Sequence, residues 1–270
     1  MSGAPTRTGG GAGRLGLLAA AWETERRKAL ASPVVVTTAA LVAGGITVLA
    51  ASLTLAARAG NEQIRAQLGA TLGQSGADGW TTYTGALAQV SGAAALLGFG
   101  VALSWFVGRE FADGTLAGLF ALPVSRQTTA LAKLLVYAAW AAVVAAASTV
   151  SALVAGLAIG LGPPDGGAVA ALGRLCVLVL LTAVIATPAA WTATLGRGLL
   201  SGIAATVLVI ATAQVLAVAG TGARWPFAAP ALWALDPTSV TAPQLGLPVL
   251  VGVGFGALTI RSWAHLELDR

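Results

Sequence analysis

The sequence predicts an all-α integral membrane protein with six transmembrane helices. Of its 270 residues, 57% are apolar and only 9% are charged, which lies outside the usual range for soluble domains. A charged side chain at the bilayer centre costs about 2.5–3.5 kcal/mol, so stretches without Asp, Glu, Lys and Arg mark candidate spans. Six such stretches can each hold the roughly 20 helical residues that cross a bilayer, namely 29–57, 79–108, 134–164, 175–196, 198–223 and 237–260.

We expect one membrane domain over residues 14–270, preceded by a flexible Gly- and Ala-rich tail at residues 1–13. The first long apolar run begins near Val34, too far along the chain to be the core of a secretory signal peptide, so we expect it to remain in the mature protein. The spans are expected near residues 34–57, 86–108, 130–160, 173–195, 199–220 and 246–261.

The basic residues predict that both termini are cytoplasmic. In that orientation most of the Lys and Arg side chains lie inside, which satisfies the positive-inside rule, and the outside holds Arg58, Arg65, Arg174 and Arg224. The abundance of Ala, and of Arg over Lys, is typical of a GC-rich bacterial genome. We therefore expect a multi-pass protein of the bacterial cytoplasmic membrane.

Two segments outside the spans each leave two interpretations open. Residues 14–32 alternate Leu and Trp with a charged patch at 23–28, which favours an amphipathic helix along the inner surface or a solvated extension of the first span that ends at Pro33. Residues 222–245 are rich in Trp and Pro. They either dip back into the membrane, where protein would have to cover their backbone, or lie at the headgroups outside.

The inner connection between the second and third spans is the most informative stretch. We expect a short helix at Thr115–Ala121, with Asp113 as its N-cap, Pro123 after its end and Ser125 as the cap of the third span. Its apolar face would hold Leu116, Leu119, Phe120 and Leu122. A helix with so few polar groups needs a partner surface, whether membrane or protein.

This stretch resembles the type 2 permease family of ATP-binding-cassette (ABC) transporters. The family pattern is an acidic residue, Gly-Thr, an apolar pair, Pro-Val-Ser-Arg and a Lys in the next helix. This chain has, in the same order, Glu110, Gly114-Thr115, Leu119-Phe120, Pro123-Val124-Ser125-Arg126 and Lys133.

The resemblance implies that the connection is a coupling helix that docks on a separate ATPase subunit. An apolar ridge would fill a groove on the ATPase, and Glu110, Asp113 and Arg126 would form charged hydrogen bonds at its rim. The interface residues that this implies are Glu110, Phe111, Asp113, Gly114, Thr115, Leu119, Phe120, Pro123 and Arg126.

Several function classes are disfavoured because the residues they need are missing. No G-x-x-x-x-G-K-[ST] sequence is present to bind nucleotide phosphates, so ATP hydrolysis is expected on another chain. The single histidine, His265, follows the last span, which disfavours Ser-His catalysis and metal-assisted hydrolysis in the membrane. We therefore expect no catalytic residues, no metal and no cofactor. The basic residues are scattered between apolar segments, so we expect no nucleic-acid partner either.

The resemblance thus implies the membrane-spanning permease subunit of an ABC exporter, and the apolar spans suit an amphipathic or hydrophobic substrate, which the sequence does not identify. The resemblance implies a homodimer or a heterodimer with a second permease, driven by separate ATPase subunits. Two alternatives stay open. One is a secondary transporter, which would need an ion-linked polar site within the spans. The other is a non-transport membrane subunit of an ABC-like complex.

The charge distribution generates a topological prediction. A reporter fused after Arg270 should be cytoplasmic and one inserted near Gln74 should be external, because the positive-inside rule places the Arg- and Lys-rich connections inside. Accessibility of each reporter to a membrane-impermeant reagent in intact cells is the measurement. An external C-terminal reporter would show that the number of spans is wrong.

Overall fold

The computed structural model describes residues 10–72, 79–120 and 123–267, and within these ranges all regular secondary structure is helical. Two short irregular turns are a π-helical turn, η1 (Leu41–Gly45), and a 3-10 turn, η2 (Gly222–Arg224). The α-helices are α1 (Gly10–Leu30), α2 (Pro33–Ala40), α3 (Ile46–Arg58), α4 (Glu62–Leu72), α5 (Trp80–Ala112), α6 (Leu116–Phe120), α7 (Arg126–Ala158), α8 (Gly166–Ile185), α9 (Pro188–Leu195), α10 (Leu199–Val218), α11 (Ala229–Leu235) and α12 (Ala242–Ala264).

Within the described ranges, six helical segments are long and apolar enough to cross a membrane, which confirms the predicted fold class. The first joins α2, η1 and α3, the fourth joins α8 and α9 across a break before Pro188, and the others are α5, α7, α10 and α12. Each of the six overlaps one of the expected spans. The chain is therefore a multi-pass membrane protein by the length and composition of its helices.

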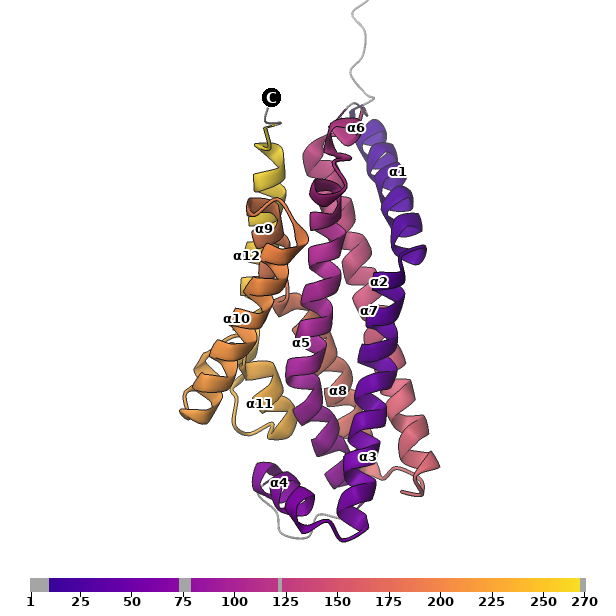
Figure 1. Ribbon diagram of the computed structural model, residues 1–270, viewed down its shortest axis with the longest axis vertical. Coiled ribbons are helices and arrows are strands. Elements are labelled where there is room, and N and C mark those ends of the chain that lie inside the picture. Colours follow the sequence, from indigo (N-terminus) through magenta and orange to yellow (C-terminus); the bar gives the residue numbers. More distant parts are fainter. Residues whose placement is uncertain (1–9, 73–78, 121–122, 268–270) are drawn as a thin grey trace, which may run out of the picture.

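The helices form one elongated bundle around α5 (Figure 1). Helix α5 packs against α3, α8, α9 and α10, and α7 packs against α1, α8 and α12. One end of the bundle holds α6, the start of α1 and the end of α12, and we call it the α6 end. The opposite end holds α4, and we call it the α4 end. Both described ends of the chain therefore lie at the α6 end, as an even number of spans requires.

Helix starts are capped as the sequence suggests. Ser125 begins α7, and its hydroxyl accepts a hydrogen bond from the Thr128 amide at 3.1 Å, as expected. The Asp165 carboxylate accepts from the Ala168 amide at 2.7 Å at the start of α8. These bonds satisfy amides that have no partner inside the helix. The helix boundaries follow from local polar residues flanking apolar runs.

Trp140 lies in the middle of a span, far from the boundary position that most tryptophans in the sequence occupy. The structure places it in an aromatic cluster, with ring centroids 5.6 Å from Phe99 and 5.9 Å from Tyr137. The Tyr137 hydroxyl donates to the Ala183 carbonyl at 2.8 Å, which joins α7 to α8. Trp140 is therefore a packing residue of the bundle interior rather than an interfacial anchor.

The proline-rich segment folds back onto the bundle. Helix α11 packs against α5 and α8, and Ala229, Pro230 and Ala234 are buried there. Figure 1 shows α11 alongside the lower part of α5 rather than beyond its end. This is the protein-covered arrangement that a membrane-dipping segment requires.

Two N-terminal features differ from expectation. Helix α1 begins at Gly10, four residues before the expected start at Arg14, and residues 1–9 lie outside the described residues. Helix α4 lies in the connection between the first and second spans, where the sequence analysis gives no helix. Asn61 precedes α4, and its side chain accepts from the Ile64 amide at 3.1 Å, a helix-start signal that the search for long apolar runs passed over.

Candidate functional site: a buried charge cluster beneath the α5–α7 connection

The α5–α7 connection, residues 113–125, turns sharply at a glycine. Gly114 has a φ of +65°, which L-residues with a side chain rarely adopt. Its amide donates to the Phe111 carbonyl at 3.4 Å and the next amide, of Thr115, donates to the Glu110 carbonyl at 3.1 Å. This pair of bonds is a Schellman motif that ends α5 and sets the direction of α6.

The short expected helix is present in reduced form. It was expected at Thr115–Ala121, and α6 spans Leu116–Phe120, while residues 121–122 lie outside the described residues. Asp113 was expected to cap this helix, and that expectation is wrong. Asp113 is the C-terminal cap of α5, and its carboxylate accepts a hydrogen bond from Arg109 at 3.1 Å, one turn earlier on the same helix.

The expected interface residues divide between exposed and buried positions. Asp113, Gly114, Thr115 and Pro123 are exposed at the α6 end. Three others, Phe111, Leu119 and Arg126, are partly buried. Leu116, from the expected apolar ridge, is turned inward and is 9% exposed. The side chains of Phe120 and Leu122 lie outside the described residues.

Glu110 occupies a different place from the one expected. It was expected at the rim of a partner contact, but it is only 4% exposed and lies inside the chain. Its Oε1 atom is 2.6 Å from Lys133 Nζ on α7 and 3.0 Å from Lys28 Nζ on α1. Its carboxylate is therefore committed to ion pairs within this chain.

Glu25 completes the group, which we call the charge cluster: Glu25, Lys28, Glu110 and Lys133. Glu25 Oε2 is 2.8 Å from Lys133 Nζ, and Glu25 Oε1 is 2.8 Å from Lys28 Nζ. Each lysine thus bridges the two carboxylates, and the two positive charges balance the two negative ones. Lys133 is 1% exposed and Glu25 is 4% exposed, so water reaches the cluster only near Lys28.

Glu25 and Lys28 keep their charges at neutral pH. Burial alone would raise the pKa of Glu25, but the Lys133 and Lys28 ammonium groups outweigh it and lower that pKa below 4.5. Burial likewise opposes the charge on Lys28, but Glu25 and Glu110 raise the pKa of Lys28 above 10.5. Glu25 Oε1 and Lys28 Nζ are therefore an ionised pair on α1 across the physiological range.

A tryptophan connects the cluster to the last part of the chain. Lys133 Nζ lies 5.8 Å from the ring centroid of Trp263, which is fully buried near the end of α12. The Trp263 indole N–H donates to the Thr194 hydroxyl on α9 at 3.1 Å, and its ring packs edge-on against Phe111 at 6.0 Å. The cluster and Trp263 therefore join α1, α5 and α7 to α9 and α12.

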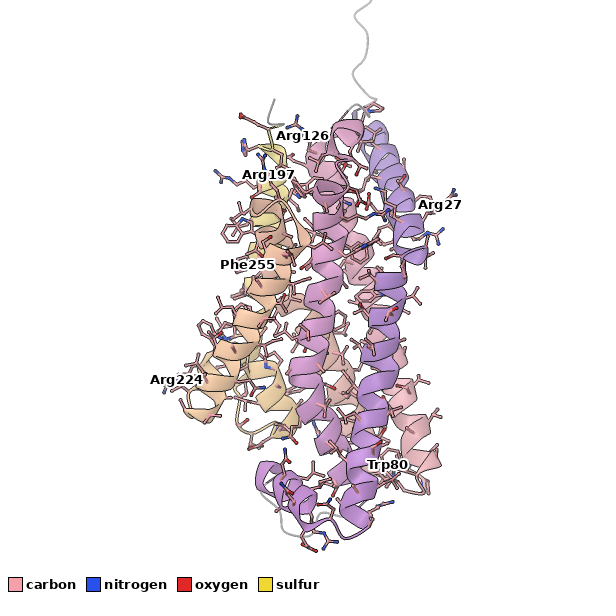
Figure 2. The ribbon with its side chains drawn as sticks, viewed as in Figure 1. Arg27, Trp80, Arg126, Arg197, Arg224 and Phe255 are labelled. Atoms are coloured by element: carbon pink, nitrogen blue, oxygen red, sulfur yellow. The ribbon has the colours of Figure 1, made fainter. Side chains whose placement is uncertain are left out.

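Two arginines hold the backbone that follows α12. Arg126, at the first position of α7, donates to the Leu266 carbonyl, and Arg197, in the α9–α10 turn, donates to the Glu267 carbonyl at 3.5 Å. Figure 2 shows both arginines at the α6 end, close to the end of the chain. Arg126 thus makes an internal bond, whereas Asp113 is exposed.

Glu25 and Lys28 were missed as cluster members because the sequence places them in a dense run of charges. That run was expected to lie on the surface, and Arg27 does point away from the bundle (Figure 2). A usable signal was the four-residue spacing of Ala21, Glu25 and Ala29, which puts them on one helix face, and all three are buried. Leu15 and Leu30 are instead 71% and 66% exposed.

The charge cluster connects helices of the bundle to one another. Among the described residues, no group of three or more His, Cys, Asp or Glu side chains is placed to hold a metal ion. What the cluster does is fix the end of α5, and with it the α5–α7 connection, to α1 and α7. A displacement of α6 would therefore move three long helices together.

The charge cluster generates a stability prediction. Lys133→Met leaves two buried carboxylates with one lysine, and breaking a buried ion pair typically costs about 3–5 kcal/mol. The purified variant should show a clear drop in its thermal unfolding midpoint in detergent. Adding Glu110→Gln to Lys133→Met leaves one ion pair, Glu25–Lys28, whose charges cancel. The double variant should recover part of the drop in the unfolding midpoint. Arg27→Met, at an exposed position of α1, is the matched control and should change the midpoint little. An unchanged midpoint in Lys133→Met would mean that the cluster does not hold the helices.

Comparison with known proteins gives one family. Residues 24–213 match the family model described as ABC-2 family transporter protein, and this match includes the charge cluster and the α5–α7 connection. Comparison with curated proteins gives no match. Since the matched range covers more than half of the 270 residues, the chain belongs to the ABC-2 family of transporter membrane proteins, as its α5–α7 connection suggested.

Proposed function

We propose that the protein is the permease subunit of an ATP-driven exporter in the bacterial cytoplasmic membrane, with its α6 end in the cytoplasm. A separate ABC ATPase would bind the exposed part of the α5–α7 connection. Family membership supports the transporter role, because ABC-2 proteins are the membrane components of transporters. The absence of a phosphate-binding loop in the sequence favours hydrolysis on another subunit.

The observation that carries the proposal is the combination of an exposed turn with a buried anchor. Asp113, Gly114 and Thr115 are exposed, whereas Glu110, three residues before them, is held by two lysines. A partner that pushes on the turn would therefore act on a rigid unit rather than on a flexible loop. Transmission of ATP-driven motion requires such a rigid element.

The interface residues take two roles in this proposal. The exposed members, Asp113, Gly114, Thr115 and Pro123, would contact the ATPase together with the apolar pair at Leu119 and Phe120. Glu110, Phe111 and Arg126 would act as positioning residues, because Glu110 binds Lys133, Phe111 packs on Trp263, and Arg126 binds the Leu266 carbonyl. The positioning role replaces the rim role that the sequence suggested for Glu110.

A second permease copy or a related chain would complete the transport pathway. Only 11% of the apolar window of α10 and 17% of that of α12 are buried within the chain, against 56% for α5. These faces are apolar, as surfaces against lipid or another permease must be. Symmetric pairing is the commonest arrangement for membrane and soluble oligomers alike, which favours a dimer.

Secondary transport is the less favoured alternative. It would need an ionisable group within the spans that can exchange protons or ions. Glu110 is the sole Asp or Glu within the six candidate spans, and both lysines of the cluster neutralise it. A carboxylate committed in this way is poorly suited to ion exchange.

The proposed docking role generates a prediction for Gly114→Val. A β-branched residue resists a φ of +65°, so the variant should misdirect α6 and lower co-purification of the ATPase and transport-linked ATP hydrolysis at least severalfold. The measurement is pull-down of a co-expressed ABC ATPase partner, with membrane levels of each variant matched to wild type.

Gly60→Val is the matched control for that experiment. Gly60 has a φ of +90° and ends α3 in the same kind of Schellman motif, but it lies at the α4 end. A side chain at either glycine would meet no atom within 4 Å, so both variants carry similar backbone strain without a clash. Equal loss of ATPase binding in both variants, or full binding by Gly114→Val, would contradict the docking role.

A further inference from the structure

Arg174 is the feature of the bundle that the proposed function leaves unexplained. It lies on α8, eight residues after the first residue of that helix, and it is partly buried. Its Nε atom is buried and has no hydrogen-bond partner among the described residues. A buried, unpaired N–H on a permanently charged guanidinium is costly, so a native structure that keeps one usually has a partner for it.

Several other basic side chains of the bundle have partners within the chain. Arg58 donates to the Ile159 carbonyl at 3.2 Å, and Arg109 pairs with Asp113 at 3.1 Å. Lys28 and Lys133 belong to the charge cluster. No described residue forms an ion pair or a hydrogen bond with Arg174. Arg174 therefore differs from the residues that serve to hold helices together.

Arg174 lines a cavity of about 70 Å³ between α5, α8 and α11. The polar residues of its wall are Arg174 and two threonines, Thr81 and Thr84, from the first turns of α5. Among the residues that the structure describes, no carboxylate is in the wall. The cavity is thus positively charged, carries hydroxyl groups, and is large enough for one small oxyanion or a few waters.

The two threonines differ in what they can offer a ligand. The Thr84 hydroxyl already donates to the Trp80 carbonyl at 2.8 Å, so its hydrogen is committed to its own helix. The Thr81 side chain makes no hydrogen bond with the described residues and is exposed in the first turn of α5. A ligand in the cavity could therefore accept hydrogen bonds from the Arg174 guanidinium and the Thr81 hydroxyl.

We propose that Arg174 and Thr81 bind a phosphate-class oxyanion in the α5–α8–α11 cavity, supplied by a phospholipid headgroup or by free phosphate. A planar guanidinium with several fixed N–H groups matches the oxygens of a phosphate, which is why arginine is common where phosphate is recognised. The site lies toward the α4 end, because Thr81 follows the first residue of α5 there. Helix α11 contributes Ala234 and Leu235 to the wall, so an occupied cavity would also hold α11 against the bundle.

The test measures ligand-dependent stabilisation of the full chain, purified in a neutral detergent and stripped of lipid. The probes are phosphatidylglycerol, diacylglycerol with the same acyl chains but no phosphate, and sodium phosphate against sodium chloride at equal ionic strength. Phosphatidylglycerol should raise the thermal unfolding midpoint saturably, and diacylglycerol should not. A matching rise with sodium phosphate would identify free phosphate as sufficient, whereas a rise with the lipid alone would identify the headgroup as the source.

Arg174→Leu should weaken the apparent affinity for the effective probe at least tenfold. Without added probe it should be as stable as wild type or more stable, because it removes an unpaired buried N–H. Arg224→Leu is the matched control. Arg224 is exposed on η2, also away from the α6 end, and Figure 2 shows it at the free end of α10. The control should bind as wild type does.

Arg174→Lys keeps the charge but loses the forked donor geometry, so it should bind several times more weakly than wild type. If Arg174→Leu does not fold, Arg174→Lys is the variant that tests the proposed site. The proposal is overturned if no phosphate-bearing probe stabilises the wild-type chain. It is equally overturned if the Arg174 variants that fold respond to the probes as wild type does.

Discussion

The structure depends on four charges grouped at one end of a membrane bundle, of which Glu25, Glu110 and Lys133 are buried. Isolated charges are expensive in such a place, and they are tolerated here because each lysine meets both carboxylates at 2.6–3.0 Å. This requirement fixes the relative positions of three helices at once. If α1 shifted, Glu25 and Lys28 would move with it. Glu110 and Lys133 would then each lose one of their two ion pairs. The bundle therefore has one favoured arrangement at its α6 end.

That constraint explains how a short exposed turn can act on a large membrane domain. The turn at Gly114 follows Glu110 by one helical turn, and Glu110 is tied to α1 and α7. Trp263 extends the connection to α9 and α12. At the opposite end Arg174 is left unpaired by the described residues, beside α11. In the proposed function the α6 end would transmit force, and in the further proposal the α4 end would bind a ligand.

The sequence predicts the fold well because the bilayer imposes a simple rule. Uncharged stretches gave six spans, and the ordered residues from Glu110 to Lys133 indicated the family. It predicted the surroundings of Glu110 poorly, because an acidic residue at a span boundary looks the same whether it faces a partner or an internal lysine. Glu25 lies 85 positions before Glu110, and no local pattern reveals that they share Lys133. Asp113 was wrongly assigned to the start of α6. Helix α5 extends to Ala112, and the Asp113 carboxylate accepts a hydrogen bond from Arg109 in the last turn of α5.

The central claim is that the charge cluster holds α6 in a fixed position relative to α1. The most direct measurement is the distance distribution between spin labels at Gly118 on α6 and Leu15 on α1, both exposed, in a Cys176→Ser background. The account predicts one narrow distribution for the parent chain and for Arg27→Met, and a broadened or shifted one for Lys133→Met. An unchanged narrow distribution in Lys133→Met would contradict it.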